Sequence, residues 1–410
     1  MKSAFWALIL MGSGITAFAQ RNCATDAYYR THRSQYAEMP VERDGVEARD
    51  TVPNEIIIIP VVVHVLFHNE AQMLSDAQVR SQIDALNRDF RRMNDDAAST
   101  PEVFRSRAAD TRIMFCLAQV DPAGRPTKGI VRRYTDREYF LGDDGMKFSA
   151  SGGNDAWDTR KYLNIWVCSM LGRSLGYASF PGGPADKDGV VINYDVFGTI
   201  GNLREPFTMG RTATHEVAHW LGLKHIWGDE TCGSDDVGDT PRQLSYNYYC
   251  PSFPHTTQCS QESSGDMFMN YMDFTNDACM NMFTHGQKKK MRGLFAPGAW
   301  RNSFLRSYVC DSSLASGAPI PDDTLVAAKP AGNVKAYPNP VTDFCVLEPD
   351  GDYKLEGQIL RLYNATGILI RQVVLTSGKY TLPMRGLTPG TYFIKLGEHA
   401  NKRVIRILKL

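Results

Sequence analysis

Three histidines and one glutamate are spaced so that they could hold a metal ion beside a general base. They lie in the segment HEVAHWLGLKH. Residues four apart share one face of a helix, so His215 and His219 can direct two imidazoles at one ion while Glu216 lies beside them. Gly222 can adopt a positive φ and turn the chain back, which brings His225 to the same ion.

This ligand set is typical of catalytic zinc, because three neutral imidazoles leave the fourth position to a water. Bound zinc lowers the pKa of that water to about 7, and a neighbouring carboxylate can accept its proton. Glu216 is the only glutamate placed for that role. A single histidine is more often structural, but five fixed positions should arise by chance in a chain of this length only on the order of 10⁻⁵ of the time. We therefore expect a hydrolytic zinc site.

Composition bounds the possible partners and the compartment. Acidic and basic residues balance at 45 each, so we expect no nucleic-acid partner. Residues 1–19 predict a cleaved signal peptide, because Lys2 precedes an apolar run that ends in the pattern Ala17-Phe18-Ala19. That run is too short for a membrane span, and we expect no transmembrane segment. Nine cysteines follow, an odd number that leaves one thiol over in an oxidising compartment.

The elements that must position the histidines are predicted from periodicity. The run IIIIPVVVHVLF from Ile56 is typical of a buried strand, and Ser75 with Gln78 forms a capping-box pattern at the start of a helix. The apolar positions of that helix are Val79, Ile83, Leu86, Phe90 and Met93. Further strand-like runs begin at Arg112, Gly129, Tyr162 and Asp188. Ala213, Val217 and Leu221 form an apolar stripe that could pack the histidine-bearing helix on the sheet. Interleaved strands and helices predict an α/β (α+β) domain.

Changes in composition divide the rest of the chain. Residues 20–50 are polar, lack periodicity and are interpreted as a pro-segment, and residues 51–312 as the catalytic domain. Residues 313–333 have the composition of a linker. Residues 334–410 contain short alternating strands broken by Asn, Gly and Pro, which predict an all-β sandwich.

The zinc motif followed by a methionine in MNYMDF resembles the metzincin pattern of an extended zinc helix and a Met-turn, with Met272 as the Met-turn residue. Within metzincins the chain is similar to the pappalysin family. The similarity lies in IPVVVHVLF, GYASFPGGPADKDGVVI, HEVAHWLGLKHIWGD, DDVGDTP and NYMDFTNDACMNMFTHGQKKKM. It implies a twisted mixed sheet above the cleft, a zinc helix and a looser lower half. It also implies cleavage of peptides and extracellular proteins, with substrate bound as an extra strand at the sheet edge.

The resemblance implies further site residues. Family pairing gives the disulfides Cys232–Cys259 and Cys250–Cys279. The acidic loop GSDDVGDTP resembles the family's calcium loop, for which we nominate Asp235, Gly238 and Thr240. The alternatives are a solvated acidic turn, or ligation by Asp236 or Asp239.

Two positions behind the Met-turn bear on catalysis and specificity. Relatives carry a tyrosine where this chain has Phe274, which cannot donate a hydrogen bond to a tetrahedral intermediate. Either another group, such as Tyr271, replaces it or oxyanion stabilisation rests mainly on zinc. Bacterial relatives prefer arginine (or lysine) after the scissile bond, and Asp277 is the candidate carboxylate, although Asp273 shares that segment and Asp277 could be a plain surface residue.

The two ends of the chain resemble regulatory and sorting segments. Cys23 matches a pro-segment cysteine that ligates the zinc in latent family members, which would account for the odd thiol; pairing with Cys310 or another cysteine is the alternative. The pattern YPNP, LYNATGILI, LTPGTYFIKL and KRVIRILKL resembles the sorting domain of the type IX secretion system, which implies export through the periplasm and partners in that machinery. A carbohydrate- or protein-binding sandwich is the alternative.

Two other functions remain open at this point. A non-catalytic adhesin could retain a structural zinc, although such a site has no use for Glu216 and normally takes its fourth ligand from the protein. A zinc amidase or lipid hydrolase would cleave small amides and degrade no protein. The fates of Cys116, Cys168, Cys310 and Cys345 are not determined by the sequence.

Overall fold

The computed structural model describes residues 20–37, 55–172, 174–259, 264–316, 325–326, 333–350, 354–365, 368–396 and 403–410. The predicted signal peptide at residues 1–19 lies outside these ranges. Among the described helices, none has both the length and the apolar character needed to cross a membrane.

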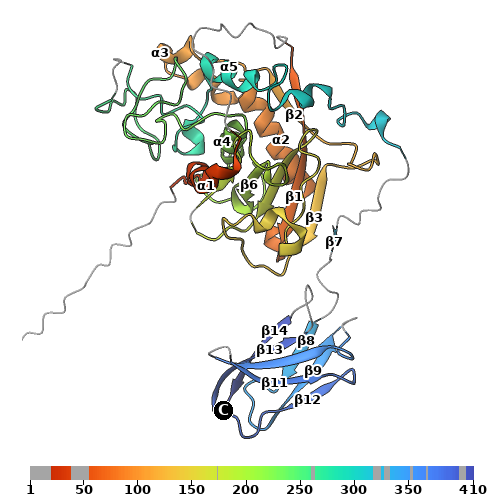
Figure 1. The fold of residues 1–410 in the computed structure, drawn as a ribbon. Helices are drawn as coiled ribbons and strands as arrows, with labels where there is room; N and C mark the ends of the chain where they lie inside the picture. Colours follow the sequence, from red (N-terminus) through yellow and green to blue (C-terminus); the bar gives the residue numbers. More distant parts are fainter. Residues whose placement is uncertain are drawn as a thin grey trace, which may run out of the picture.

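The run from Ile56 forms β1 (Ile57–Phe67), the central strand of the catalytic sheet (Figure 1). Its neighbours are β2 (Ile113–Leu117), β3 (Ile130–Tyr134) and β4 (Leu163–Cys168), followed by β6 (Val190–Asn193) and the edge strand β5 (Gly176–Ala178). All pairings with β1 are parallel, whereas β5 pairs antiparallel with β6. Continuous apolar strands fit this arrangement because both faces of a mainly parallel sheet are covered. The predicted mixed sheet is confirmed.

The predicted backing helix is α2 (Asp76–Phe90), which packs on the sheet. Ser75 Oγ accepts a hydrogen bond from the Gln78 backbone amide, as the capping pattern predicts. The Gln78 side chain, however, donates to the Phe197 carbonyl at 2.9 Å, so only half of the capping box forms. Met93 was wrongly placed in the helical repeat. It lies beyond the last turn and is 66% exposed, because α2 ends at Phe90.

The histidine-bearing helix is α4 (Arg211–Trp220), and every one of its residues is buried. It contacts α2, β5 and β6, and the predicted apolar stripe of Ala213, Val217 and Leu221 is fully covered. The remaining α-helices are α1 (Thr25–His32), α3 (Glu102–Arg105) and α5 (His285–Gly293). The helix α1, from the predicted pro-segment, contacts the edge strand β5 and is drawn in red in Figure 1.

Short 3₁₀ turns lie between these helices and strands. They are Arg33–Gln35, Glu70–Gln72, Asp95–Ser99, Gly145–Lys147, Ser149–Ser151, Ala185–Lys187, Tyr194–Val196, Asp277–Cys279, Asn302–Arg306 and Ser312–Leu314.

Three disulfides connect segments of this part. Cys232–Cys259 and Cys250–Cys279 are the pairs that the family resemblance implies, and Cys116 pairs with Cys310. The first two cross-link the described chain between α4 and α5, where regular structure is sparse. Cys23, Cys168 and Cys345 are unpaired, and the last two are buried. The alternative pairing of Cys23 with Cys310 is therefore not found.

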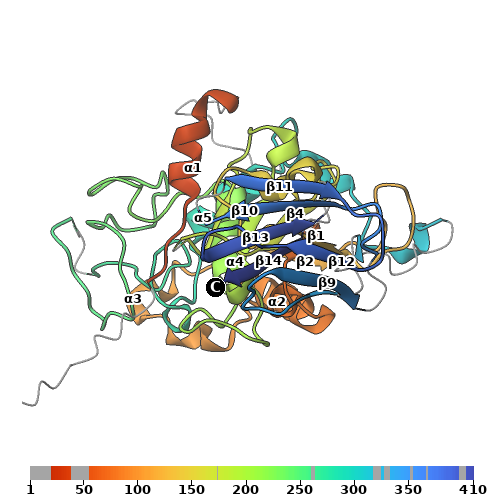
Figure 2. The same ribbon diagram turned by 90° about the horizontal axis from the view of Figure 1, so that it is seen from below.

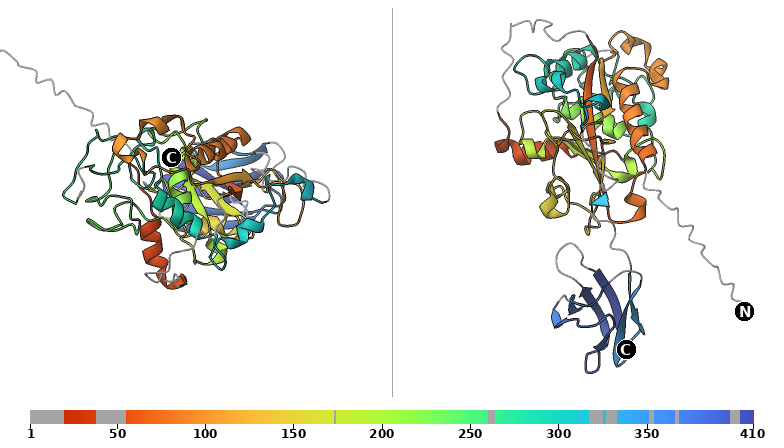
Figure 3. Two further views of the ribbon diagram at one scale, coloured as in Figure 1. Left: turned by 90° about the horizontal axis from the view of Figure 1, so that it is seen from above. Right: turned by 90° about the vertical axis from the view of Figure 1, so that its right-hand side faces the viewer.

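The C-terminal part consists of two antiparallel sheets around a separate apolar core, as predicted for an all-β sandwich. One sheet has the order β11 (Leu369–Val374), β10 (Ile359–Asn364), β13 (Gly390–Leu396), β14 (Arg403–Lys409) (Figure 2). The other has the order β12 (Tyr380–Pro383), β9 (Phe344–Asp350), β8 (Asn333–Tyr337), strands that are labelled in Figure 1. Figure 3 shows the strands of this part in blue from two further sides. Within the predicted linker, β7 (Leu325–Val326) pairs with β3, because a short apolar stretch can add to an open sheet edge.

Candidate metal centre and active site

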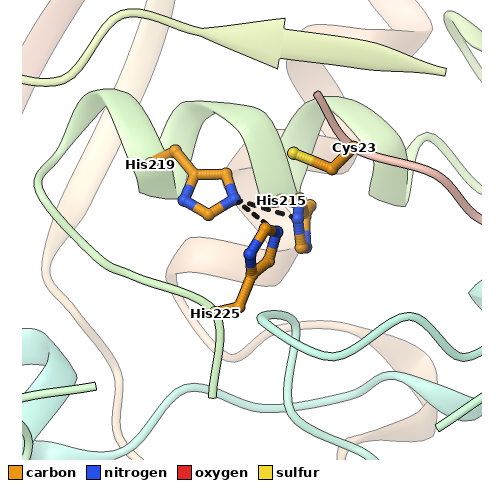
Figure 4. A group of neighbouring side chains, drawn as sticks. All are labelled: Cys23, His215, His219 and His225. Atoms are coloured by element: carbon orange, nitrogen blue, oxygen red, sulfur yellow. Dashed lines mark hydrogen bonds between the residues drawn. The ribbon is translucent and has the colours of Figure 1, made fainter. Parts of the chain in front are cut away.

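The three histidines of the motif converge on one point (Figure 4). His219 Nε2 lies 3.1 Å from His215 Nε2 and 3.1 Å from His225 Nε2. Among the described residues, Cys23 joins them in a group whose ligand atoms all lie within 4.8 Å of one another. Figure 4 shows the Cys23 sulfur directed toward the three rings.

The contacts of Nδ1 in each ring show whether Nε2 can bind a metal. His215 Nδ1 lies 2.7 Å from the Tyr271 carbonyl, and His219 Nδ1 lies 2.7 Å from the Leu223 carbonyl. A carbonyl can only accept, so each Nδ1 carries the proton and each Nε2 presents a lone pair. His225 Nδ1 contacts the Asp229 carboxylate in the same way. Three lone pairs that face each other repel unless a cation lies between them, and the donor set therefore fits zinc.

Burial keeps His215 and His219 neutral. Desolvation, with the neighbouring histidines, lowers the pKa of His219 to about 3 and that of His215 well below its ordinary value. Neutral imidazole is the form that binds a metal.

The turn that brings His225 to the group depends on Gly222. Its φ is +84°, a left-handed conformation that glycine adopts without steric cost. The Leu223 amide donates to the Ala218 carbonyl at 3.0 Å and the Gly222 amide donates to the His219 carbonyl at 2.8 Å. These two bonds form a Schellman motif, and they end the helix at the predicted turn of Gly222.

Glu216 faces the same space from the next helical position. Its carboxylate accepts a hydrogen bond from Thr25 Oγ1 at 2.9 Å, and the Cys23 thiol donates to the same oxygen at 3.3 Å. Burial raises the pKa of Glu216 to about 7. A carboxyl group in that range can both accept and return a proton near neutral pH.

The predicted Met-turn lies beside the histidines, and the Tyr271 carbonyl that precedes Met272 contacts His215 Nδ1. Met272 is fully buried, and its carbonyl accepts from the Ile226 amide at 3.1 Å, which ties the turn to the segment that carries His225. Phe274 packs with ring centroids 4.9 Å from His225 and 5.8 Å from His215. Its phenyl ring offers no hydrogen-bond donor at this border of the site.

The suggestion that Tyr271 replaces the missing oxyanion donor is wrong. Its hydroxyl donates to the Asp89 carboxylate at 2.9 Å, and Thr214 Oγ1 donates to the same carboxylate at 2.7 Å. Asp89 belongs to α2, so the hydroxyl is engaged behind α4 rather than at the histidines.

Asp277 lies at the start of α4 rather than on the surface. It is 1% exposed, and its carboxylate accepts from the Met209 amide at 2.8 Å and the Arg211 amide at 3.3 Å. The guanidinium of Arg21 forms a buried ion pair with it. Arg21 also donates to the Thr275 carbonyl at 3.1 Å. Asp273 instead accepts from Asn247 and Gln243, at the other side of this segment.

The calcium nominees lie apart from the histidines, in the loop after α4. Thr240 Oγ1 lies 2.9 Å and 3.0 Å from the two carboxylate oxygens of Asp235 and 2.9 Å from the Val237 carbonyl. Asp235 is 4% exposed, and burial raises its pKa to about 6.

Three residues that contact the site were not predicted from the sequence motifs. Asp229 orients His225 and follows it by four residues, a spacing that could have drawn attention. Arg21 and Thr25 flank Cys23 and contact Asp277 and Glu216, but nothing in an aperiodic polar segment distinguishes them beforehand.

Comparisons with known proteins agree with this site. The family model described as pregnancy-associated plasma protein-A matches residues 149–296, and that of a secretion-system C-terminal sorting domain matches residues 335–409. An extracellular metalloprotease of Neurospora crassa is 29% identical over 294 residues, which are 68% of this chain and 90% of the relative. One from Verticillium alfalfae is 30% identical over 260 residues, 61% of this chain and 79% of the relative.

Solved structures of high identity share the catalytic fold. Mature mirolysin of Tannerella forsythia in complex with a cleaved peptide is 51% identical, with a TM-score of 0.62 over 65% of this chain and 100% of that chain. A promirolysin mutant of the same organism is 46% identical, with a TM-score of 0.62 over 71% of this chain and 93% of that chain. The chain therefore belongs to the pappalysin family of metalloendopeptidases, as a secreted zinc-dependent member that carries a type IX secretion sorting domain.

Proposed function

We propose that this metalloendopeptidase is made as a latent precursor and, once processed, cleaves extracellular proteins and peptides before arginine or lysine. In the proposed division, residues 1–19 direct export, 20–50 keep the enzyme latent, and 51–312 carry out catalysis. Residues 313–333 then link it to the sorting domain at 334–410, whose partner would be the type IX secretion machinery.

We assign the zinc to His215, His219 and His225, and the general base to Glu216. When bound, zinc would polarise a water and the scissile carbonyl. Glu216 would take the proton of the attacking water and deliver it to the leaving amine, a role that its raised pKa and its position beside the histidines support. Since Phe274 offers no donor, we expect oxyanion stabilisation to rest mainly on zinc, at a cost of about 10²–10³ in rate relative to a site with that donor.

The single observation that carries the specificity is the buried contact of Arg21 with Asp277. The Arg21 side chain comes from outside the proposed catalytic domain, and its guanidinium is held by this carboxylate and by the Thr275 carbonyl at 3.1 Å. The Phe207 ring also packs on this side chain, with its centroid 5.1 Å from the Arg21 guanidinium carbon. We infer that Arg21 occupies the place of the substrate arginine, because planar bidentate donors and a buried carboxylate are matched in geometry and charge.

Latency would follow from the same segment. The Leu175 amide donates to the Asn22 carbonyl at 2.8 Å, and the Ala24 amide donates to the Gly176 carbonyl at 3.1 Å. The pro-segment thus adds to the edge of β5, where an extended substrate would bind. Between these bonds Cys23 points at the histidines, and a thiolate there would hold the metal's open position and exclude the nucleophilic water.

We also propose a calcium ion in the loop after α4, held by Asp235, Thr240 and the carbonyl of Gly238. Support comes from the close approach of hydroxyl, carboxylate and carbonyl oxygens, the ligand types that calcium prefers. The other acidic residues of the loop are engaged elsewhere. Asp236 pairs with Lys224 at 2.7 Å, and Asp239 accepts from Thr284 Oγ1 and the Gly286 amide.

The experiment compares the processed enzyme with its Glu216→Ala variant on two peptides that differ only in arginine or leucine after the scissile bond. We expect the native enzyme to cleave the arginine peptide preferentially and the variant to be inactive. Equal inactivity of both proteins, with zinc bound in both, would overturn the assignment of the site.

Latency is tested on the uncut chain with Cys23→Ala, Arg21→Ala and the double variant. Each single change should raise the cleavage of a short peptide in the first minutes, before any processing is visible on a gel. An unchanged, inactive double variant would contradict the proposed role of these two residues.

A further inference from the structure

Tyr28 of the pro-segment helix α1 enters the catalytic domain away from the histidines. Its side chain is 7% exposed, and its hydroxyl donates to Asp144 Oδ2 at 2.7 Å. The Tyr28 side chain is therefore buried in the domain rather than lying on its surface. We call the site that surrounds it, formed by Asp144, Lys147 and Tyr177, the socket.

The socket lies on the opposite face of the sheet from α4. Side chains alternate between faces along a strand, so Gly176 and Ala178 of β5 share one face and Tyr177 points to the other. Gly176 is on the face of Glu216, since a Cβ added there would lie 3.0 Å from the Glu216 side chain. Tyr177 joins a separate apolar cluster with Tyr28, Trp166 and others. The pro-segment thus crosses the edge strand and inserts Tyr28 on the far side.

The floor of the socket is charged and fully buried. Asp144 is 2% exposed and accepts from the Tyr177 hydroxyl at 2.9 Å, while Lys147, at 0% exposure, pairs with it at 3.0 Å. Lys187 approaches the second carboxylate oxygen at 3.4 Å. Burial opposes ionisation of Asp144, but Lys147 and the two tyrosine hydroxyls lower its pKa overall. The carboxylate is charged and presents Oδ2 to the incoming hydroxyl.

The walls of the socket select an aromatic ring. The Tyr28 ring lies 4.8 Å from the Tyr177 ring, and the Lys147 ammonium lies 5.0 Å from the Tyr28 centroid. Both contacts favour a π system, through ring packing and cation–π attraction. A phenylalanine ring could make the same contacts with Tyr177 and Lys147 but would leave Asp144 Oδ2 without its neutral donor. The negative charge of Asp144 would repel an acidic side chain.

We propose that Asp144, Lys147 and Tyr177 form a binding site for a tyrosyl side chain, separate from the catalytic cleft, which keeps the pro-segment bound after the chain is cut. In the processed enzyme the cut fragment must therefore dissociate before the cleft is open. The inference rests on the proposed pro-segment, and it does not depend on catalysis by Glu216.

The test uses the full secreted chain in a Glu216→Ala background, with a recognition sequence for a specific protease placed between residues 38 and 54. After the cut and dilution, size-exclusion chromatography and mass spectrometry follow the release of the N-terminal fragment. The test variant is Tyr28→Phe. The matched control is Tyr29→Phe, whose ring packs on Tyr36 and Phe180 and which neighbours Tyr28 in the same helix.

The native and Tyr29→Phe fragments should stay bound. The Tyr28→Phe fragment should dissociate about 10- to 100-fold faster, because the buried Asp144 carboxylate loses the hydroxyl that donates to its Oδ2. The same ratio should hold with Cys23→Ser, and when synthetic peptides of residues 20–37 are bound to the released enzyme. Equal release of the two variants, or immediate loss of the native fragment, would overturn the proposed site. Because binding is read directly, an inactive enzyme would refute the proposed function without affecting this result.

Discussion

If the proposed arginine preference depends on Asp277, replacing Asp277 by asparagine should yield an enzyme that discriminates little between residues after the scissile bond. Asparagine has nearly the same shape, and its amide oxygen can still accept from the Met209 and Arg211 amides, which approach at 2.8 Å and 3.3 Å. The pocket wall should therefore persist while its negative charge is lost. Only a substrate that brings a guanidinium should be affected.

The magnitude follows from the burial of the pair. Arg21 and Asp277 are each 1% exposed in the ion pair, so the substrate arginine that replaces Arg21 would also be desolvated. Removing one member of a buried pair costs about 3–5 kcal/mol. The low end, about 3 kcal/mol, corresponds to a loss of about 100-fold in kcat/KM for an arginine peptide. A matched peptide with leucine should change by less than about threefold, as it makes no charged contact.

The assay measures kcat/KM for both peptides with native, Asp277→Asn and Asp273→Asn enzymes. Asp273 is the matched control, because it is a fully buried carboxylate four residues away that accepts from Asn247 at 2.7 Å and does not contact Arg21. Its replacement should lower both rates alike, if at all. An equal loss on both peptides for Asp277→Asn, with an unchanged Tm, would refute the reasoning.

Three further outcomes are expected. Tyr271→Phe should lower the free energy of unfolding by about 1–3 kcal/mol, since buried Asp89 loses a donor. A kcat that is about 100-fold lower at an unchanged Tm would instead indicate that the hydroxyl takes part in catalysis. Burial lowers the pKa of His64 in the folded protein to about 4, below its ordinary 6.5. As the pH falls, the unfolded chain therefore binds a proton at His64 before the folded protein does. The free energy of unfolding should therefore be unaffected by His64 above pH 6.5 and should fall by up to about 3 kcal/mol toward pH 4. Urea melts that give the same pH dependence of the free energy of unfolding for the native and His64→Asn proteins would contradict this. Removal of the proposed calcium ion with EGTA should lower the Tm by about 5 °C in the native enzyme and much less in Asp235→Asn. Equal shifts in the two proteins, or no shift in either, would contradict the proposed ligands.

The sequence alone determined the elements whose cause is local. The β-branched run predicted β1, Ser75 marked the start of α2, and helical spacing with Gly222 predicted how three histidines meet. The end of α2 was less well determined: Met93 continues the apolar period, but the chain leaves the helix at Phe90. Periodicity carries no information about where tertiary packing ceases.

What only the tertiary structure decided involves residues far apart in the chain. Arg21 meets Asp277 across 256 positions, and Tyr28 meets Asp144 across 116, and no local pattern encodes either contact. The direction of the Tyr271 hydroxyl was likewise fixed by Asp89 on another helix. Short-range spacing specifies which groups share a helix face, whereas the choice of partner for a buried charge or hydroxyl depends on which segments the fold brings together.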